Sequence, residues 1–322
     1  MALSEFSLIQ QYFSELTAQR DDVVLGIGDD CALLSCPPGH QLAVSVDTLV
    51  ENVHFFADVN PQTLGHKSLA VSLSDLAAMG ATPAWFTLAL TLPEVNDTWL
   101  QQFAAGLADL AKRHNIQLVG GDTTRGPLSI SIQVHGFVEN DMAFRRDTAN
   151  AGDLIFVSGT LGDAGAALKH RIDNWSPEEL ADEDWLFLQH RLESPTPRND
   201  LTAMLKGYVT AAIDISDGLL ADLGHILNKS HQGAVIQLDK LPLSASLHKL
   251  PSEQAIQLAL NSGDDYELCF TVPAVNADLL TPFFDQITCI GEITTDNRLI
   301  LQDRTGQQIH IDSRKGYDHF GA

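Results

Sequence analysis

Three apolar, strand-like segments of this chain each lead into an aspartate, and this recurrence constrains the fold more than any other feature. The segments are 41–47, 116–122 and 209–214, which end in Asp47, Asp122 and Asp214. Segments with the apolar spacing of helices lie between and after them, at 61–79, 99–114 and 219–228. Because open α/β sheets bind ligands beyond the carboxyl ends of their strands, the pattern predicts an α/β fold with a carboxylate-lined cleft.

The stretch Gly-Ile-Gly-Asp-Asp at 26–30 adds two adjacent carboxylates directly after a glycine-containing turn. Asp29 and Asp30 repel each other unless a cation lies between them or one carboxyl is protonated. Mg²⁺ prefers oxygen ligands of this kind, so the pair is a candidate metal site. A solvated turn without a metal is the alternative that this motif alone leaves open.

The net charge narrows the possible ligands. The chain carries 42 acidic and 19 basic residues, which leaves a net charge of −23. Such an excess of negative charge argues against binding to a nucleic-acid backbone. It also prevents an acidic cleft from holding a polyphosphate directly. Metal ions resolve that conflict, because they bridge carboxylate and phosphate oxygens.

No segment predicts secretion or a membrane anchor. The N-terminus lacks a basic region, and the longest charge-free apolar run, 76–92, is broken by Gly80 and Pro83. The cysteines form no C-x-x-C pair, so free thiols are expected rather than zinc ligands or disulfides. They are Cys31, Cys36, Cys269 and Cys289. We therefore expect a cytoplasmic protein with no membrane partner.

The length allows two domains, which we place at 1–150 and 151–322. Residues 128–134 alternate apolar and polar side chains and predict a strand with one buried face. Asp75 lies among the apolar residues of the predicted 61–79 helix. It is therefore either at the exposed edge of that helix or bound to a partner.

Other local signals predict further elements. Apolar spacing predicts a helix over 5–17, and Asn96 or Asp97 is a candidate cap for the helix that follows. The acidic segment 178–184 is interpreted as a solvated loop or helix face.

Two glycine-rich segments are candidates for contact with phosphate. We interpret 120–126 as a turn whose backbone N–H groups face phosphate, with Arg125, Arg145 and Arg146 as positive side chains. Residues 159–165 look like a phosphate loop, but no Gly-Lys-Ser/Thr follows, so a Walker A site is rejected. The residues predict Mg²⁺-nucleotide chemistry without a P-loop. A structural or merely metal-binding protein remains the alternative.

Seven motifs occur in order along nearly the whole chain. They are G-I-G-D-D at 26–30, S-V-D-T at 45–48, H-F at 54–55, S-L-S-D-L-A-A-M-G-A at 72–81, G-G-D-T at 120–123, D-I-S-D-G-L at 214–219 and G-Y-D-H-F at 316–320. Together they resemble the thiamine-monophosphate kinase family, a branch of the aminoimidazole ribonucleotide synthetase superfamily. The resemblance implies ATP-dependent conversion of thiamine monophosphate to thiamine diphosphate with several Mg²⁺ ions, the last step in making that coenzyme.

The resemblance also implies an architecture. It predicts a two-domain α/β (α+β) fold of the aminoimidazole ribonucleotide synthetase type. The N-terminal domain would be a mixed sheet with helices on one face that pairs with its twin into a barrel-like homodimer. The C-terminal α/β domain would complete the active site.

Site residues follow from the resemblance, motif by motif. The implied metal ligands are Asp30, Ser45, the Val46 backbone, Asp47, Asp75, Asp122, Asp214 and Asp217, with Asp29 beside them. The implied ATP contacts are Gly121, Asp122, Arg146 and Ser216, and the implied substrate contacts are His54, Asp264 and Tyr317. Two positions depart from the family pattern, since Val46 replaces a familiar threonine and Asp264 replaces the usual glutamate.

The implied mechanism is direct in-line transfer of the γ-phosphoryl group of ATP to the substrate's monophosphate. A phosphate monoester has a second pKa of about 6 and needs no general base, so none is assigned. His54 is expected to contact substrate or to be structural, rather than to act as a base. Tyr317 offers an aromatic face to the thiazolium cation, or it only anchors the tail. Another ATP-dependent member of the superfamily and a non-catalytic nucleotide-binding protein are the rival hypotheses.

Overall fold

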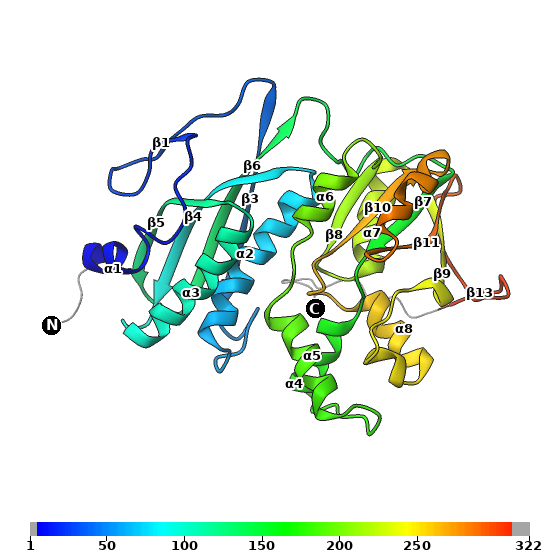
Figure 1. Cartoon of the computed structure of the whole chain (residues 1–322). Helices are drawn as coiled ribbons and strands as arrows, with labels where there is room; N and C mark the ends of the chain where they lie inside the picture. The colour runs from blue at the N-terminus through cyan, green and yellow to red at the C-terminus, as the bar shows by residue number, and fades with distance from the viewer. Residues whose placement is uncertain (1–4, 311–322) are drawn as a thin grey trace. The chain divides into compact units, whose positions relative to one another are not determined.

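The computed structural model describes residues 5–310 and divides the chain into two compact units. The N-terminal unit is Met1–Ala143 and the C-terminal unit is Phe144–Ala322. Figure 1 shows the elements of each unit along the chain. The division at residue 150 that we derived from the sequence stays a prediction.

The N-terminal unit is built on a four-stranded sheet with strand order β3-β6-β4-β5. The strands are β3 (His40–Val50), β4 (Thr82–Leu92), β5 (Gln117–Arg125) and β6 (Ser129–Glu139). β4 and β5 run parallel, whereas β6 is antiparallel to both β3 and β4. The prediction of a mixed sheet in this half of the chain is confirmed.

Two helices cover one face of this sheet (Figure 1). α2 (Pro61–Ala78) packs on β3, β4 and β6, and α3 (Asp97–Arg113) packs on α2. Asn96 caps α3, since its Oδ1 accepts a hydrogen bond from the Trp99 N–H at 3.1 Å, as expected for this residue type. The remaining elements are α1 (Glu5–Tyr12), β1 (Val23–Leu25) and β2 (Leu33–Leu34).

The two faces of the sheet differ in exposure. The alternation predicted for 128–134 is present, because Ile130 and Ile132 are buried whereas Gln133 is exposed. Three of the exposed side chains on β3 are large and apolar: Leu42 is 45% exposed, Val44 50% and Val46 61%. An apolar strand face that no described element covers is unusual in a folded unit.

The C-terminal unit contains a seven-stranded sheet of order β13-β12-β9-β11-β7-β10-β8. Its strands are β7 (Asp153–Ser158), β8 (Ala211–Ile215), β9 (Gly233–Gln237), β10 (Glu267–Pro273), β11 (Ile287–Thr294), β12 (Leu299–Gln302) and β13 (Gln308–Ile309). Its helices are α4 (Asp163–Asp173), α5 (Asp182–Glu193), α6 (Asn199–Leu205), α7 (Leu219–Ser230), α8 (Ser252–Asn261) and the 3₁₀ segments η1 (Leu238–Lys240), η2 (Leu247–Lys249) and η3 (Ala274–Phe283). Every residue of β8 is buried, although this strand lies at one edge of the sheet.

Several local predictions need correction. Residues 120–125 are not a turn but the second half of β5, because their backbone pairs in parallel with β4. Asp47 lies within β3 rather than at its end, since pairing with β6 extends that strand to Val50. The helix predicted over 5–17 ends at Tyr12, and the acidic segment 178–184 contains a buried carboxylate, Asp184.

No helix within residues 5–310 is both long enough and apolar enough to cross a membrane.

Candidate functional site

Asp47 on β3 and Asp75 on α2 interact electrostatically in the N-terminal unit, although 28 positions separate them in the chain. Ser45 also faces this pair, and its hydroxyl donates a hydrogen bond to Asp75 Oδ2. Burial and, to a smaller extent, the charge of Asp75 raise the pKa of Asp47 to about 6, while a hydrogen bond from Ser72 opposes the shift. Asp47 Oδ2 is buried without a hydrogen-bond partner.

This arrangement fits a cation. A buried carboxylate oxygen without a donor, beside a second carboxylate, is costly unless positive charge neutralises it. Ser45, Asp47 and Asp75 offer the hard oxygen ligands that Mg²⁺ prefers. The side chain of Val46 is 61% exposed on the other face of β3, so the backbone carbonyl is the group that Val46 can supply. Of the two interpretations of Asp75, the structure supports the bound one, since the residue is only partly exposed and accepts a hydrogen bond.

The Gly-Asp-Asp turn lies in an exposed loop of the same unit. Its shape depends on Asp29, whose Oδ1 accepts a hydrogen bond from the Asp30 N–H at 2.8 Å. The carboxylate of Asp30 is exposed to solvent. Within residues 5–310, no cluster of three or more His, Cys, Asp or Glu side chains is close enough to hold a metal ion. The full ligand set inferred from the family therefore stays a prediction.

Gly121 and Asp122 lie on β5, at the edge of the sheet. A Cβ at position 121 would come within 1.9 Å of the Leu88 carbonyl oxygen, so the close pairing with β4 requires glycine there. Asp122 pairs with Ala89, whereas Asp47 pairs with Ile132, which in turn pairs with Leu88. The pleat therefore directs Asp122 and Asp47 to opposite faces of the sheet.

His54 is held by the end of β3. Its Nδ1 accepts a hydrogen bond from the Val50 N–H at 3.0 Å, which leaves Nε2 to carry the proton of the neutral ring. This arrangement presents a donor at Nε2. The Nδ1 atom is occupied by this hydrogen bond, so it is not available to abstract a proton, and a contact between His54 and substrate stays a prediction.

The three arginines expected near phosphate differ in their surroundings. Arg145 forms a two-point ion pair with Asp147, with Nε–Oδ1 and Nη2–Oδ2 distances of 2.7 and 2.6 Å. That carboxylate occupies the guanidinium edge that would otherwise face a phosphate. Arg125 and Arg146 are exposed.

In the C-terminal unit, two loops that carry predicted site residues are joined through their backbones. The Asp264 N–H donates to the Ser216 carbonyl at 2.9 Å, and the Tyr266 N–H donates to the Ile215 carbonyl at 2.8 Å. A Cβ on Gly263 would lie 2.2 Å from the Ser216 carbonyl oxygen, so glycine is needed for this approach. Asp264, a predicted substrate contact, therefore lies beside Ser216, a predicted ATP contact.

The side chains of these loops are partly enclosed. Asp214 is 4% exposed, while Ser216 and Asp217 are partly buried. The Tyr266 hydroxyl donates to Asp264 Oδ1 at 3.1 Å. Asp264 has φ of 64°, a left-handed conformation that aspartate adopts more readily than most residues do. The aspartate that departs from the family pattern thus suits its backbone.

A buried network of charged residues supports the 263–267 segment, and sequence reasoning did not identify it. Glu267 is fully buried and accepts hydrogen bonds from Arg191 Nη2 at 2.9 Å and from Arg198 Nε at 2.6 Å. Burial raises the pKa of Asp265 well above its usual range, although the Gly162 N–H donates to its Oδ2 at 2.7 Å. The glycine loop at 159–165 thus binds the protein's own carboxylate, in agreement with the rejection of a Walker A site. Glu267 at the start of the apolar run E-L-C-F-T-V was the signal for a buried ion pair.

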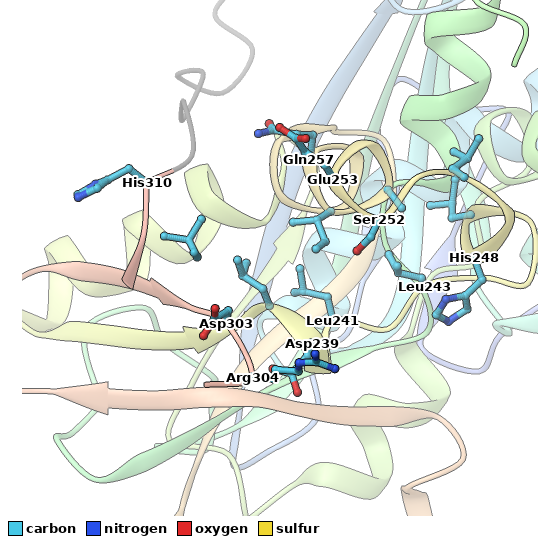
Figure 2. Close-up of a pocket in the computed structure, with 16 residues that line it drawn as sticks. Asp239, Leu241, Leu243, His248, Ser252, Glu253, Gln257, Asp303, Arg304 and His310 are labelled. Carbon is cyan, nitrogen blue, oxygen red and sulfur yellow. The ribbon is translucent and has the colours of Figure 1, made fainter. Parts of the chain in front are cut away.

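A separate hollow of about 810 Å³ lies elsewhere in the C-terminal unit. Figure 2 shows Leu241 and Leu243 in its wall, with Glu253 and Gln257 of α8 on one side and Asp303 and Arg304 on the other. No predicted site residue among residues 5–310 lines it. Tyr317, the third predicted substrate contact, lies outside the described residues.

Comparisons with known proteins cover the whole chain. The model for AIR synthase related protein, N-terminal domain, matches residues 28–138, and that for the C-terminal domain matches 150–304. Thiamine-monophosphate kinase of Escherichia coli (strain K12) is 48% identical over 327 residues, covering all of both chains.

Two solved structures are similar to this chain. The crystal structure of thiamine-monophosphate kinase from Stenotrophomonas maltophilia K279a has a TM-score of 0.83 and 46% identity, covering 90% of this chain and 93% of that one. AaThiL complexed with AMPPCP and TMP has a TM-score of 0.77 and 32% identity, covering 89% of each chain.

Proposed function

This chain belongs to the thiamine-monophosphate kinase family, and on that premise we propose that it transfers the γ-phosphoryl group of ATP to thiamine monophosphate. The products are thiamine diphosphate and ADP. The observation that carries the proposal is the match to a solved relative bound to an ATP analogue, AMPPCP, and to TMP, which covers 89% of each chain. The Asp47–Asp75 pair supports it, because it suits the cation that a phosphoryl transfer between two anions requires.

The reaction needs little covalent participation from the protein. The substrate's monophosphate oxygen attacks the γ-phosphorus in line with the leaving ADP, and no side chain has to remove a proton, because the monoester is already ionised near neutral pH. The protein's task is to hold two mutually repelling anions in the reactive orientation.

Mg²⁺ would neutralise charge on the transferring phosphoryl group when bound. In the N-terminal unit the proposed ligands are Asp30, Ser45, the Val46 carbonyl, Asp47, Asp75 and Asp122; in the C-terminal unit they are Asp214 and Asp217. Ser45 fixes the orientation of Asp75 through its hydrogen bond, so the ligand oxygens are arranged before a cation binds.

The remaining contacts divide between the two substrates. Gly121, Asp122, Arg146 and Ser216 are proposed to contact ATP, and His54, Asp264 and Tyr317 to contact thiamine monophosphate. The Nε2 donor of His54 suits a hydrogen-bond acceptor on the substrate. The carboxylate of Asp264 suits the thiazolium cation, and the Tyr266 hydroxyl fixes its position.

We also propose that the protein is a cytoplasmic homodimer. The exposed apolar side chains of β3, Leu42, Val44 and Val46, offer an uncovered surface that a second copy of the sheet can bury. Replacing Val44 by aspartate would place a charge in that interface. Light scattering at micromolar concentration would then report a dimer for the unaltered protein and a monomer for Val44→Asp. A monomeric unaltered protein would contradict the proposal.

An acceptor panel tests the function. The protein is incubated with ATP and Mg²⁺ plus thiamine monophosphate, thiamine, selenide or a ribonucleotide amidine, and both ADP and the phosphorylated product are measured. We expect ADP and thiamine diphosphate to form in equal amounts when thiamine monophosphate is the acceptor, and no ADP to form with the other acceptors. ADP formation with a different acceptor would assign another superfamily activity. ADP formation with none of them would favour a non-catalytic nucleotide-binding protein.

A further inference from the structure

Asp222 is a buried carboxylate to which the sequence motifs assign no role. It lies in the first turns of α7 and is 3% exposed. Its Oδ2 accepts hydrogen bonds from three successive backbone N–H groups, those of Ser216, Asp217 and Gly218, at 3.1, 3.0 and 3.1 Å. One oxygen therefore organises the whole D-I-S-D-G turn from the inside.

Three consecutive N–H groups that converge on one point form an anion-binding concavity. In phosphate loops this concavity faces the ligand. Here it faces inward and holds Asp222. Gly218, which precedes α7, supplies no side-chain cap.

The turn is held from its other side by the 263–266 segment, through the Asp264 N–H to the Ser216 carbonyl and the Tyr266 N–H to the Ile215 carbonyl. The amides of the turn thus bind Asp222, and two of its carbonyls bind the neighbouring segment. A ligand at this turn would therefore contact its side chains rather than the N–H groups of residues 216–218. This contrasts with recognition of a phosphate by backbone amides.

We propose that Asp222 is a positioning residue for the nucleotide: it fixes the backbone of residues 216–218 so that the side chains of Ser216 and Asp217 are presented to Mg²⁺-ATP. The inference rests on the proposed function for the identity of the ligand. It adds a residue that touches neither substrate nor metal and acts only through three amides.

The test compares Asp222→Ala and Asp222→Asn with the unaltered protein. Asparagine keeps an acceptor oxygen, whereas alanine removes it. We expect Asp222→Ala to raise KM for ATP and the Mg²⁺ concentration for half-maximal rate by about tenfold or more, with KM for thiamine monophosphate changed by less than about threefold. Asp222→Asn should keep KM for ATP and the Mg²⁺ requirement close to those of the unaltered protein, because its oxygen can accept the same hydrogen bonds.

A matched control is Asp184. Its carboxylate is also buried, at 6% exposure, and also accepts a backbone N–H at the start of a helix, that of Ala181 at 2.8 Å. It supports α5 rather than the D-I-S-D-G turn. Asp184→Ala should lower the melting temperature as Asp222→Ala does, yet leave KM for ATP and the Mg²⁺ requirement unchanged.

Two further readouts do not depend on catalysis. Calorimetric binding of AMPPCP with Mg²⁺ should weaken by about tenfold in Asp222→Ala. Amide hydrogen exchange at residues 216–218 should accelerate in this variant and not in Asp184→Ala. If the unaltered protein binds AMPPCP but does not phosphorylate thiamine monophosphate, the proposed function fails while these readouts still decide the role of Asp222.

The inference is overturned if Asp222→Ala retains normal AMPPCP affinity and slow exchange at 216–218. It is equally overturned if Asp222→Ala weakens both substrates alike and Asp184→Ala does the same, because both carboxylates would then serve only the stability of the unit.

Discussion

Buried carboxylates occur in both units, but different groups surround them. In the N-terminal unit, burial and the charge of Asp75 raise the pKa of Asp47, and only a hydrogen bond from Ser72 opposes that rise. One carboxylate oxygen of Asp47 has no hydrogen-bond donor. In the C-terminal unit, Glu267 is bound by Arg191 and Arg198, and Asp222 by three backbone amides.

The difference separates two uses of the same residue type. Where the protein supplies its own donors or cations, the carboxylate organises a loop and has little to offer a metal. Where it supplies few, the site is incomplete without an external cation. We therefore interpret Asp47 and Asp75 as a binding site, and Asp222 and Glu267 as its structural counterparts in the other unit.

The largest expected effect is on turnover, through Asp75. If the N-terminal pair binds Mg²⁺, Asp75→Asn removes a charged ligand and should lower kcat by about a thousandfold, equivalent to about 4 kcal/mol, while the protein stays folded. Steady-state assays with saturating ATP and Mg²⁺ measure this. Asp109→Asn, at an exposed position on α3, is the matched control and should be normal. Near-normal turnover of folded Asp75→Asn would show that the Asp47–Asp75 pair is not a metal site. The buried carboxylates of the two units would then not differ in their use.

The next effect is on stability, through Glu267. Glu267→Gln leaves the guanidinium groups of Arg191 and Arg198 without their buried counter-charge, and should lower the free energy of unfolding by about 3 kcal/mol. Urea denaturation measures it, with the exposed Glu292→Gln on β11 as control. The loss should be the same with and without Mg²⁺. A loss that grows when Mg²⁺ is added would show that this carboxylate, too, belongs to a metal site.

The smallest effect concerns Asp47 and pH. Its pKa in the folded protein, about 6, exceeds the ordinary value of 3.8, so its favourable contribution is complete below about pH 4 and is lost as the pH rises through 6. Without metal, Asp47→Asn should therefore become more stable than the unaltered protein between about pH 4.5 and 7.5, by about 1–2 kcal/mol after allowance for solvent screening.

Thermal unfolding in EDTA at about pH 4.5 and at about pH 7.5 tests this expectation. Added Mg²⁺ should abolish the greater stability of Asp47→Asn. Asp109→Asn should show neither trend. An advantage that persists in saturating Mg²⁺ would mean that no cation neutralises Asp47.

Sequence by itself determined the elements whose signals are local. The alternation at 128–134 predicted a strand with a buried face, the apolar spacing at 61–79 predicted α2, and Asn96 predicted the start of α3. In each case the deciding residues lie within a few positions of one another, so spacing along the chain reports their geometry. The family motifs added the identity of the candidate ligands, but not their surroundings.

Tertiary structure decided what depends on pairing between distant strands. The glycine stretch 120–125 is a strand because β4 lies beside it, and register directs Asp122 and Asp47 to opposite faces. Glu267 meets Arg191 and Arg198 across 76 and 69 positions of the chain. Neither strand order nor register is encoded in any one segment, because both depend on which partner buries the segment's apolar face. Asp222 lies three residues beyond the D-I-S-D-G-L motif, and only the folded turn brings the N–H groups of residues 216–218 onto its carboxylate.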